Sequence, residues 1–461
     1  MLYVSNDIRK LLDVTKLLKG IKQDDADDWV EAAATMGDIY EKSWITIAAT
    51  GSSNSRKGIY SAVSDRYKAR ALQDHDFHVR EDLTSFGHGL ESWPLLTRAW
   101  AYQERQLSPR MVHFGQEQIF WACNLNFKSQ DGWYSSASFF NPHRKTSLSD
   151  WYGMVAAYSG LQLTYESDRL PAIAAIVQRV MRIRPHDTYI AGMWKDTLIP
   201  DLLWYVMSLQ ARPRSTYCIP TWSWASASGE IRNVVGDRPF QQLVQLLDVT
   251  FTPIGTPHIG QVEGARITLQ GPTCRFPESA FPILRQSVAA TGDTDINVPL
   301  TSGIRCTISR DFDWQVVEPP VGSDHDLIIL FLCKCLRDPW NLQKWHYGMI
   351  IRAVEDEVFE RVGFGHIYLD SDGDSHHSSE DISDKESSEV NDEEADVKNM
   401  AHEGAVYFFP ARPGASFFPT RSEFEARTIE IQNAGMEHEI NSDDMLSSFV
   451  RALPIQTFTI I

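Results

Sequence analysis

The stretch RAWAYQERQLSPR at residues 98–110 concentrates side chains that can bind, orient or ionise. It contains three arginines, one glutamate, two glutamines and two large aromatic residues. Such a mixture can form a catalytic site, because ionisable groups with perturbed pKa values cluster at such sites. It can equally form a partly buried polar network that fixes one element against another. No nucleophile stands beside a base at this spacing, which favours the network.

A second group of candidate residues is acidic and lies at residues 24–31. Carboxylates at the start of a helix stabilise its N-terminus by about 0.3 to 1 kcal/mol each, and the sequence favours this interpretation. The alternative is that Glu31, one turn into the helix, faces a cleft as a general base or a sugar-binding carboxylate. The group consists of Asp24, Asp25, Asp27, Asp28 and Glu31.

Two tryptophans, Trp222 and Trp224, alternate with Ser223 in the segment PTWSWAS. In a β-strand this spacing places both indole rings on one face. We expect the pair to close a core or a domain interface, with a ligand platform as the alternative.

The common catalytic motifs are absent from the sequence. There is no G-x-S-x-G elbow, no G-x-x-x-x-G-K-[ST] phosphate loop and no H-E-x-x-H zinc helix. His75 and His78 stand three apart, but a metal site needs further converging ligands, so a surface loop is favoured. We therefore predict no metal and no cofactor, and Glu31 is the single candidate for a catalytic residue.

The elements that position these residues follow from hydrophobic periodicity. Residues 24–43 are predicted to form an amphipathic helix, 44–50 a strand and 51–58 a turn, which together make an α/β unit. Residues 98–108 form a short helix that Pro109 ends, and 111–123 form a hairpin. The first domain is thus predicted to span residues 1–135.

The rest of the chain divides into two further regions. Residues 136–215 are predicted to be a connecting helical region with helices in 150–163, 170–183 and 189–207. Residues 216–461 form a β-rich domain, because short β-branched runs alternate with turns. An acidic insertion at about 370–402 interrupts that domain and is expected to be disordered. The overall class is α+β.

Composition limits the partners. The net charge is −18, and residues 371–400 alone hold eleven acidic residues against two lysines. The remaining surface has no basic stripe, so we predict that the protein binds no nucleic acid. No segment has the length and apolarity of a signal peptide or a membrane helix, which predicts a cytoplasmic protein without membrane contact. The six cysteines show no C-x-x-C spacing and are expected to be free thiols.

Taken together, several of these segments resemble the fungal heterokaryon-incompatibility (HET) domain proteins. They are residues 23–61, 94–123, 166–180, 189–205 and 220–229, and residues 98–110 resemble the family signature Arg-x-Trp-x-x-Gln-Glu-Arg-x-Leu-Ser-x-Arg. The family-signature residues, which we expect to be structural first, are Gln23, Asp24, Trp29, Glu31, Arg98, Trp100, Gln103, Glu104, Arg105, Arg110, Trp222 and Trp224. Among them, Glu104 is expected to accept hydrogen bonds from an arginine, and Gln103 to satisfy backbone groups.

The resemblance implies a doubly wound α/β fold that is distantly similar to TIR domains. It also implies a truncated domain, because no Leu-Ser-x-x-Trp-Gly motif occurs at the start of the chain. In the next family element Ile21, Gln23 and Asp24 are kept, whereas Leu17, Lys19 and Gly20 stand where the family has Asp, Leu and Cys. We therefore expect an α/β remnant, followed by the helical layer and the β-rich domain.

By resemblance, the function is fungal nonself recognition and regulated cell death, exerted through unidentified protein partners. The truncation leaves open that the protein is inactive in this role. One alternative is a TIR-like enzyme that hydrolyses NAD as its substrate, with Glu31 as the carboxylate. Another is a degraded paralogue or an incomplete gene model. A sheet that has lost a strand exposes an edge, so we also predict self-association through that edge.

Overall fold

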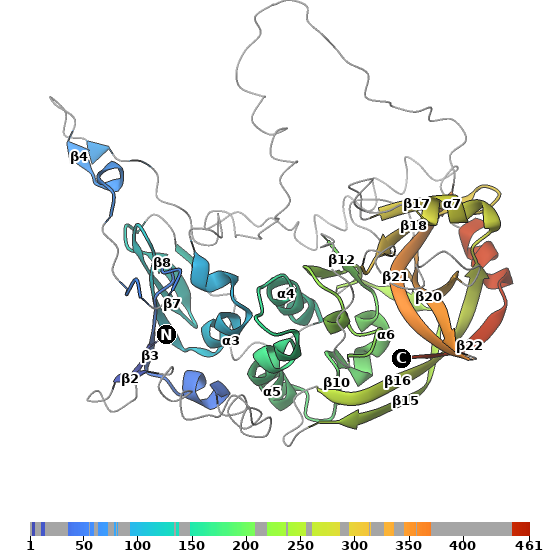
Figure 1. Ribbon diagram of the computed structural model, residues 1–461, viewed down its shortest axis with the longest axis horizontal. Helices are drawn as coiled ribbons and strands as arrows, with labels where there is room; N and C mark the ends of the chain where they lie inside the picture. The colour runs from blue at the N-terminus through green and yellow to red at the C-terminus, as the bar shows by residue number, and fades with distance from the viewer. Residues whose placement is uncertain are drawn as a thin grey trace, which may run out of the picture. The chain divides into compact units, whose positions relative to one another are not determined.

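The computed structural model describes most of the chain outside the acidic region (Figure 1). All described residues belong to one compact unit made of residues 1–369 and 439–461. The predicted disordered insertion at 370–402 lies outside the described residues. The residues that the structure describes are 2–4, 11–13, 36–54, 56–59, 63–71, 78–79, 81, 93–132, 135–137, 148–207, 219–236, 238–254, 261–285, 295–312, 314, 327–335, 345–355, 357–369 and 445–461.

The first sheet contains seven strands in the order β2-β1-β3-β6-β7-β8-β9. One face of its central strands is buried, because residues alternate between the two faces and the inward positions are apolar or hydrogen-bonded. A short hairpin, β4 (Arg70–Ala71) with β5 (His78–Val79), stands apart from it. The strands are β1 (Leu2–Val4), β2 (Leu11–Asp13), β3 (Ile45–Ala48), β6 (Arg110–Phe114), β7 (Ile119–Cys123), β8 (Asn126–Ser129) and β9 (Ser135–Ala137).

A doubly wound sheet was expected here, and the described strands differ from it. Among the described strands of this sheet, only β3 and β6 pair in parallel, and the helix α3 (Ala99–Leu107) lies in the crossover between them. The other pairs of this sheet are antiparallel. The reason is local: the short connection after Phe114 can join only antiparallel strands, whereas parallel strands need a long crossover. The predicted hairpin at 111–123 is confirmed as β6 and β7.

Two of the three predicted helices in the helical region are present. They are α4 (Leu148–Ser159) and α5 (Ala174–Ile183). The 3-10 turns η4 (Glu166–Asp168) and η5 (Pro171–Ile173) lie between them. The prediction of a helix over 189–207 is wrong. Ala191 and Gly192 have positive φ angles of 47° and 99°, which end any helix and close a hairpin instead. This segment contains β10 (Tyr189–Ile190), β11 (Met193–Trp194), η6 (Lys195–Thr197), α6 (Leu198–Asp201) and β12 (Trp204–Val206).

The strand predicted around Trp222 and Trp224 is also absent. Residues Trp224–Ser226 form a 3-10 turn, η7, and the Ser223 side chain caps it by accepting a hydrogen bond from Ala225 N at 3.0 Å. Serine readily caps a turn in this way, and that local bond competes with extended backbone.

The β-rich region contains a closed ring of strands. Its nine-stranded sheet pairs β16 with β19, β19 with β20, β20 with β21, β21 with β22 and β22 again with β16. A closed ring removes the edges of these five strands. The remaining strands extend the sheet outward, and β12 pairs separately with β13 (Ile231–Asn233). The sheet comprises β14 (Phe240–Gln242), β15 (Gln245–Pro253), β16 (Val262–Arg275), β17 (Asp295–Thr301), β18 (Ile304–Arg310), β19 (Leu327–Cys335), β20 (His346–Glu355), β21 (Val358–Leu369) and β22 (Ile455–Ile460).

One buried charge joins this barrel to the segment before it. The side chain of Arg361, on β21, is fully buried and forms an ion pair with Asp311 at 2.8 Å. Its guanidinium also donates to the carbonyl oxygens of Leu202 (2.7 Å) and Trp204 (2.6 Å) and lies 3.4 Å from the centre of the Trp204 ring. Four partners for one guanidinium offset much of the cost of burying it.

The mixture of helices and sheets confirms the α+β class. The larger of the two main apolar clusters includes Met36, Val177 and Ile460, so described residues from all three predicted regions share one core. The smaller lies within the β-rich region around Trp314 and Ile308. The boundaries at 135 and 215 remain predictions.

Candidate functional site

The signature segment folds as α3, which begins after Arg98 and ends at Leu107, before Ser108. One stripe of the helix is buried and contains Ala99, Tyr102 and Leu107. The Ser108 hydroxyl and its amide both donate to the carbonyl oxygen of Glu104, the hydroxyl at 2.7 Å, which closes the last turn before Pro109. The helix therefore presents its polar signature residues from a fixed backbone.

Trp100 connects α3 to η4. Its indole Nε1 donates to Oδ2 of Asp168 at 3.1 Å. Burial raises the pKa of Asp168, although this hydrogen bond and one from Ser167 favour the charged form. The indole therefore satisfies a carboxylate that has lost part of its water.

Gln103 connects α3 to α5. Its side chain is fully buried, and Oε1 accepts a hydrogen bond at 2.8 Å from the backbone amide of Ala175. The first amides of a helix have no partner within the helix, so this glutamine supplies one of the bonds that α5 needs at its start. The expectation that Gln103 satisfies a backbone group agrees with this contact.

Glu104 connects α3 to the helical residues 36–41. Its carboxylate accepts a hydrogen bond from the Tyr40 hydroxyl, where an arginine was expected as the donor. Burial raises the pKa of Glu104 to about 7, against the opposing effects of Tyr40 and Arg98. Arg105 lies over the ring of Tyr102 instead, 5.5 Å from its centroid.

A chain of hydroxyl groups joins the end of α3 to β3. The Oγ1 of Thr46 lies 2.8 Å from Oγ of Ser108 and 3.2 Å from Oγ of Ser43. Beyond the helix, the exposed Arg110 donates to the carbonyl oxygen of Trp44 at 3.3 Å. We call Trp100, Gln103, Glu104 and Ser108 with their partners the α3 network.

The structure places the other predicted site residues in three ways. Arg98 and Arg110 are exposed at the two ends of α3. Trp222 and Trp224 are buried in the main core, away from the α3 network in sequence and held by other elements. Gln23, Asp24, Trp29 and Glu31 lie outside the described residues, so the interpretation of Glu31 stays a prediction.

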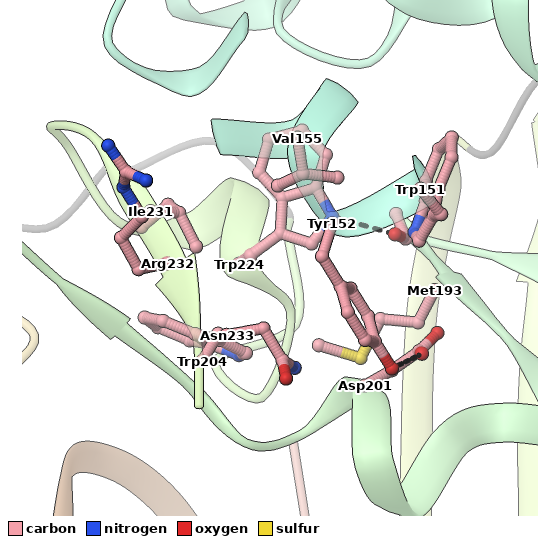
Figure 2. A pocket seen from close by; sticks show the side chains of 11 residues that line it. Trp151, Tyr152, Val155, Met193, Asp201, Trp204, Trp224, Ile231, Arg232 and Asn233 are labelled. Carbon is pink, nitrogen blue, oxygen red and sulfur yellow. Dashed lines mark hydrogen bonds between the residues drawn. The ribbon is translucent and has the colours of Figure 1, made fainter. Parts of the chain in front are cut away.

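The tryptophans belong to a second polar centre, at Asp201. Tyr152 Oη and the amide of Trp194 each donate to this buried carboxylate at 2.8 Å, and Figure 2 shows Tyr152 and Asp201 pointing toward one another. Burial raises the pKa of Asp201 to about 7, with these two bonds and one from Thr197 opposing it. Asp201 was not predicted from the sequence, because no motif surrounds it.

Asp201 lines a small cavity together with four aromatic residues, Trp151, Tyr152, Trp204 and Trp224 (Figure 2). Its volume is about 10 Å³, which is space for about one water molecule. Trp224 closes one side, and its Nε1 donates to the carbonyl oxygen of Gly192 at 2.7 Å. The Trp222 carbonyl accepts from Nε1 of Trp204 at 2.9 Å. These contacts bind the hairpin of β10 and β11 to η7, and the cavity is too small for a cofactor.

The two centres can hold protons and fix elements against one another. Glu104 and Asp201 both have a raised pKa, and each is bound by a tyrosine hydroxyl. No group of three or more metal-ligating side chains occurs among the described residues. Within the same part of the chain, none of the helices has the length and apolarity needed to cross a bilayer.

Comparison with known proteins gives one family. Residues 19–104 match the model described as heterokaryon incompatibility protein (HET), and the match ends at Glu104 within α3. No curated protein and no solved structure matches the chain.

Proposed function

Taking the chain as a HET domain protein, by its match over residues 19–104, we propose that it acts in fungal nonself recognition. In this proposal it contributes to incompatibility-type cell death through contacts with other proteins in the cytoplasm. Residues 1–135 form the HET region, 136–215 a connecting helical region and 216–461 a β-rich domain.

The α3 network is the observation that supports this proposal best. Its side chains bind three separate elements, the helical residues 36–41, η4 and α5, through Glu104, Trp100 and Gln103. A segment whose polar groups are used in this way holds the HET region against the helical region. Such an arrangement suits a module that transmits binding on one region to the other.

The experiment is expression of the full chain in fungal cells, with growth arrest and cell death as the readout. The test variant is Gln103→Leu, which removes the acceptor for Ala175 N. The matched control is Gln106→Leu, the same substitution three residues further along α3. We expect the wild type and Gln106→Leu to cause cell death, and Gln103→Leu to cause less at equal protein level. Equal activity of all three would contradict the role given to the network.

A second measurement separates protein contact from enzymatic action. Purified full-length protein is incubated with NAD, and its consumption is followed over time. The proposal expects no turnover, together with protein partners recovered with the wild type and lost with Gln103→Leu. NAD turnover that Glu31→Gln abolishes would overturn it in favour of an enzyme.

A further inference from the structure

The side chain of Asp201 is buried, and three neutral groups donate hydrogen bonds to it. They are the hydroxyl of Tyr152 on α4, the amide of Trp194 on β11 and the hydroxyl of Thr197 in η6. Neutral donors offset only part of the cost of burying a charge, which favours the protonated carboxyl group. Burial raises its pKa to about 7 against these bonds, so Asp201 changes its charge near neutral pH.

Thr197 connects Asp201 to a guanidinium at the end of α5. Nη2 of Arg184 donates to Oγ1 of Thr197 at 3.3 Å, and the Thr197 hydroxyl in turn donates to Asp201. The guanidinium also lies over the Trp194 ring, 4.7 Å from its centroid. Its positive charge favours the ionised form of Asp201 across one hydroxyl group.

A second carboxylate binds the same guanidinium. Oδ2 of Asp187 forms an ion pair with Nη2 of Arg184 at 2.6 Å, and the Asp187 side chain is only 3% exposed. Its Oδ1 accepts hydrogen bonds from the backbone amides of Thr188 (2.7 Å) and Asp196 (3.0 Å). These two amides flank the hairpin of β10 and β11. Asp187 therefore joins both ends of the hairpin to α5 through Arg184.

Other ionisable side chains surround this cluster. Arg232, on β13, lines the cavity beside the buried carboxylate (Figure 2), but its Nε is bound to Glu230 at 2.7 Å. Burial raises the pKa of Tyr189, on β10, well above its ordinary value, so this hydroxyl stays neutral. Solvent screens the exposed ionisable side chains at the two ends of the hairpin. They are His186, Lys195 and Asp196.

We propose that Asp187 and Asp201 share Arg184, and that a proton bound at Asp201 leaves the guanidinium to Asp187. Below neutral pH Asp201 is neutral, and the ion pair at Asp187 holds both ends of the hairpin. As the pH rises, Asp201 releases its proton to solvent, and its charge attracts the guanidinium through Thr197 and weakens that pair. The attachment of the hairpin to α5 is thus stronger at low pH. The cluster lies outside residues 19–104, so this proposal does not depend on the proposed function.

Infrared spectroscopy of the full chain tests the proposal, because a protonated carboxyl group and a carboxylate absorb at different frequencies. Spectra are recorded from about pH 5 to pH 9, a window that brackets the expected change. The difference between the wild type and Asp201→Asn isolates Asp201, and its protonated signal should disappear with a midpoint at about pH 7. A difference spectrum that stays constant over this window would overturn the proposal.

Asp187→Asn removes the competing charge but keeps an oxygen for the amides of Thr188 and Asp196. Arg184 is then left to Asp201, so the midpoint should fall by about one pH unit. The matched control is Asp196→Asn, the same substitution at an exposed acid in η6, which should leave the midpoint in place. Equal shifts in the two variants would contradict the sharing of Arg184.

Arg184→Met separates sharing from simple repulsion between the two carboxylates. Without the guanidinium the Asp201 midpoint should rise, and Asp187→Asn should then shift it less than it does in the wild type. Thr197→Val removes the hydroxyl between the two groups and should also raise the midpoint. Circular dichroism of each variant shows that the fold is kept. An equal shift with and without Arg184, or an unchanged midpoint in Thr197→Val, would overturn the proposal.

Discussion

The α3 network and the Arg361 centre solve the same problem with different chemistry. Both fix one region of the chain to its neighbours. The α3 network spreads the task over an indole, an amide and a carboxylate, each bonded to a different element. In the Arg361 centre, one buried guanidinium with four partners fixes the barrel to the segment before it.

The difference predicts how each region fails. A buried charge that loses its partners is costly, since the ion left behind remains desolvated. Neutral hydrogen bonds are worth less individually, at about 0.5 to 1.5 kcal/mol each. Substitution of Arg361 alone should therefore lower the free energy of unfolding strongly. In the α3 network, each single substitution should remove only a smaller part of it.

The largest effect is expected at Arg361. Arg361→Met keeps much of the apolar stem but removes the guanidinium that forms the buried ion pair with Asp311. We predict a loss of about 3 to 5 kcal/mol in the free energy of unfolding, measured by denaturant titration. Lys42→Met, which removes an exposed pair with Asp38, is the control and should cost little. Equal losses in the two variants would remove the contrast between the two regions.

The next effect is a pH dependence at Asp201. Burial raises its pKa from 3.8 to about 7 in the folded protein, so the folded state binds more protons than the unfolded state between these values. The stability contribution is present at low pH and is lost as the pH rises toward 7, at up to about 1.4 kcal/mol per pH unit. Asp201→Asn should remove this slope.

The comparison of the two proteins isolates Asp201, because Glu104 contributes a slope of the same sign to both. Thermal unfolding of the wild type and of Asp201→Asn is measured from about pH 4 to pH 8, since the slope lies in this window. The unfolding temperature of Asp201→Asn, relative to that of the wild type, should increase as the pH rises. Parallel curves would show that the carboxylate does not titrate in this range.

A smaller effect is expected at Gln103. Gln103→Leu leaves the Ala175 amide buried without its acceptor, which costs about 1 to 3 kcal/mol. Gln106→Leu on the same helix is the control. Denaturant titration of both variants measures the difference. If the control loses as much as Gln103→Leu, the cause is the helix and not the contact with α5.

The smallest effect is expected at Trp100. Trp100→Phe keeps an aromatic ring but removes the donor to Asp168, which should cost about 1 kcal/mol. The loss should shrink when Asp168→Asn is already present, because the two residues then no longer share a charged hydrogen bond. Additive losses in this double-mutant cycle would contradict the assigned contact.

Local sequence signals predicted part of this fold. Short β-branched runs indicated the β-rich region that contains β18, β19, β20 and β21, and Pro109 marked the end of α3. The hairpin at 189–194 was missed because its geometry depends on positive φ angles at Ala191 and Gly192, one of which is not a glycine. Closure of the barrel was also missed, since it requires β16 to pair with the distant strand β22.

The sequence predicted the α3 residues of the network but not the residues that bind them. The types and spacing of Trp100, Gln103 and Glu104 indicated a buried network, but their partners come from distant parts of the chain. Periodicity cannot show that Tyr40 or Asp168 approaches α3, because tertiary packing sets those distances. Asp201 gave no signal, as its raised pKa arises from burial in the fold.

The contact between Gln103 and α5 tests the central claim most directly, because it is a single bond between two regions. Amide hydrogen exchange at Ala175 is compared between the wild type, Gln103→Leu and Gln106→Leu, with the amides of β19 as internal reference. We predict faster exchange at Ala175 in Gln103→Leu alone, with the β19 amides unchanged. Unchanged exchange at Ala175 in that variant would show that the α3 signature does not hold the helical region.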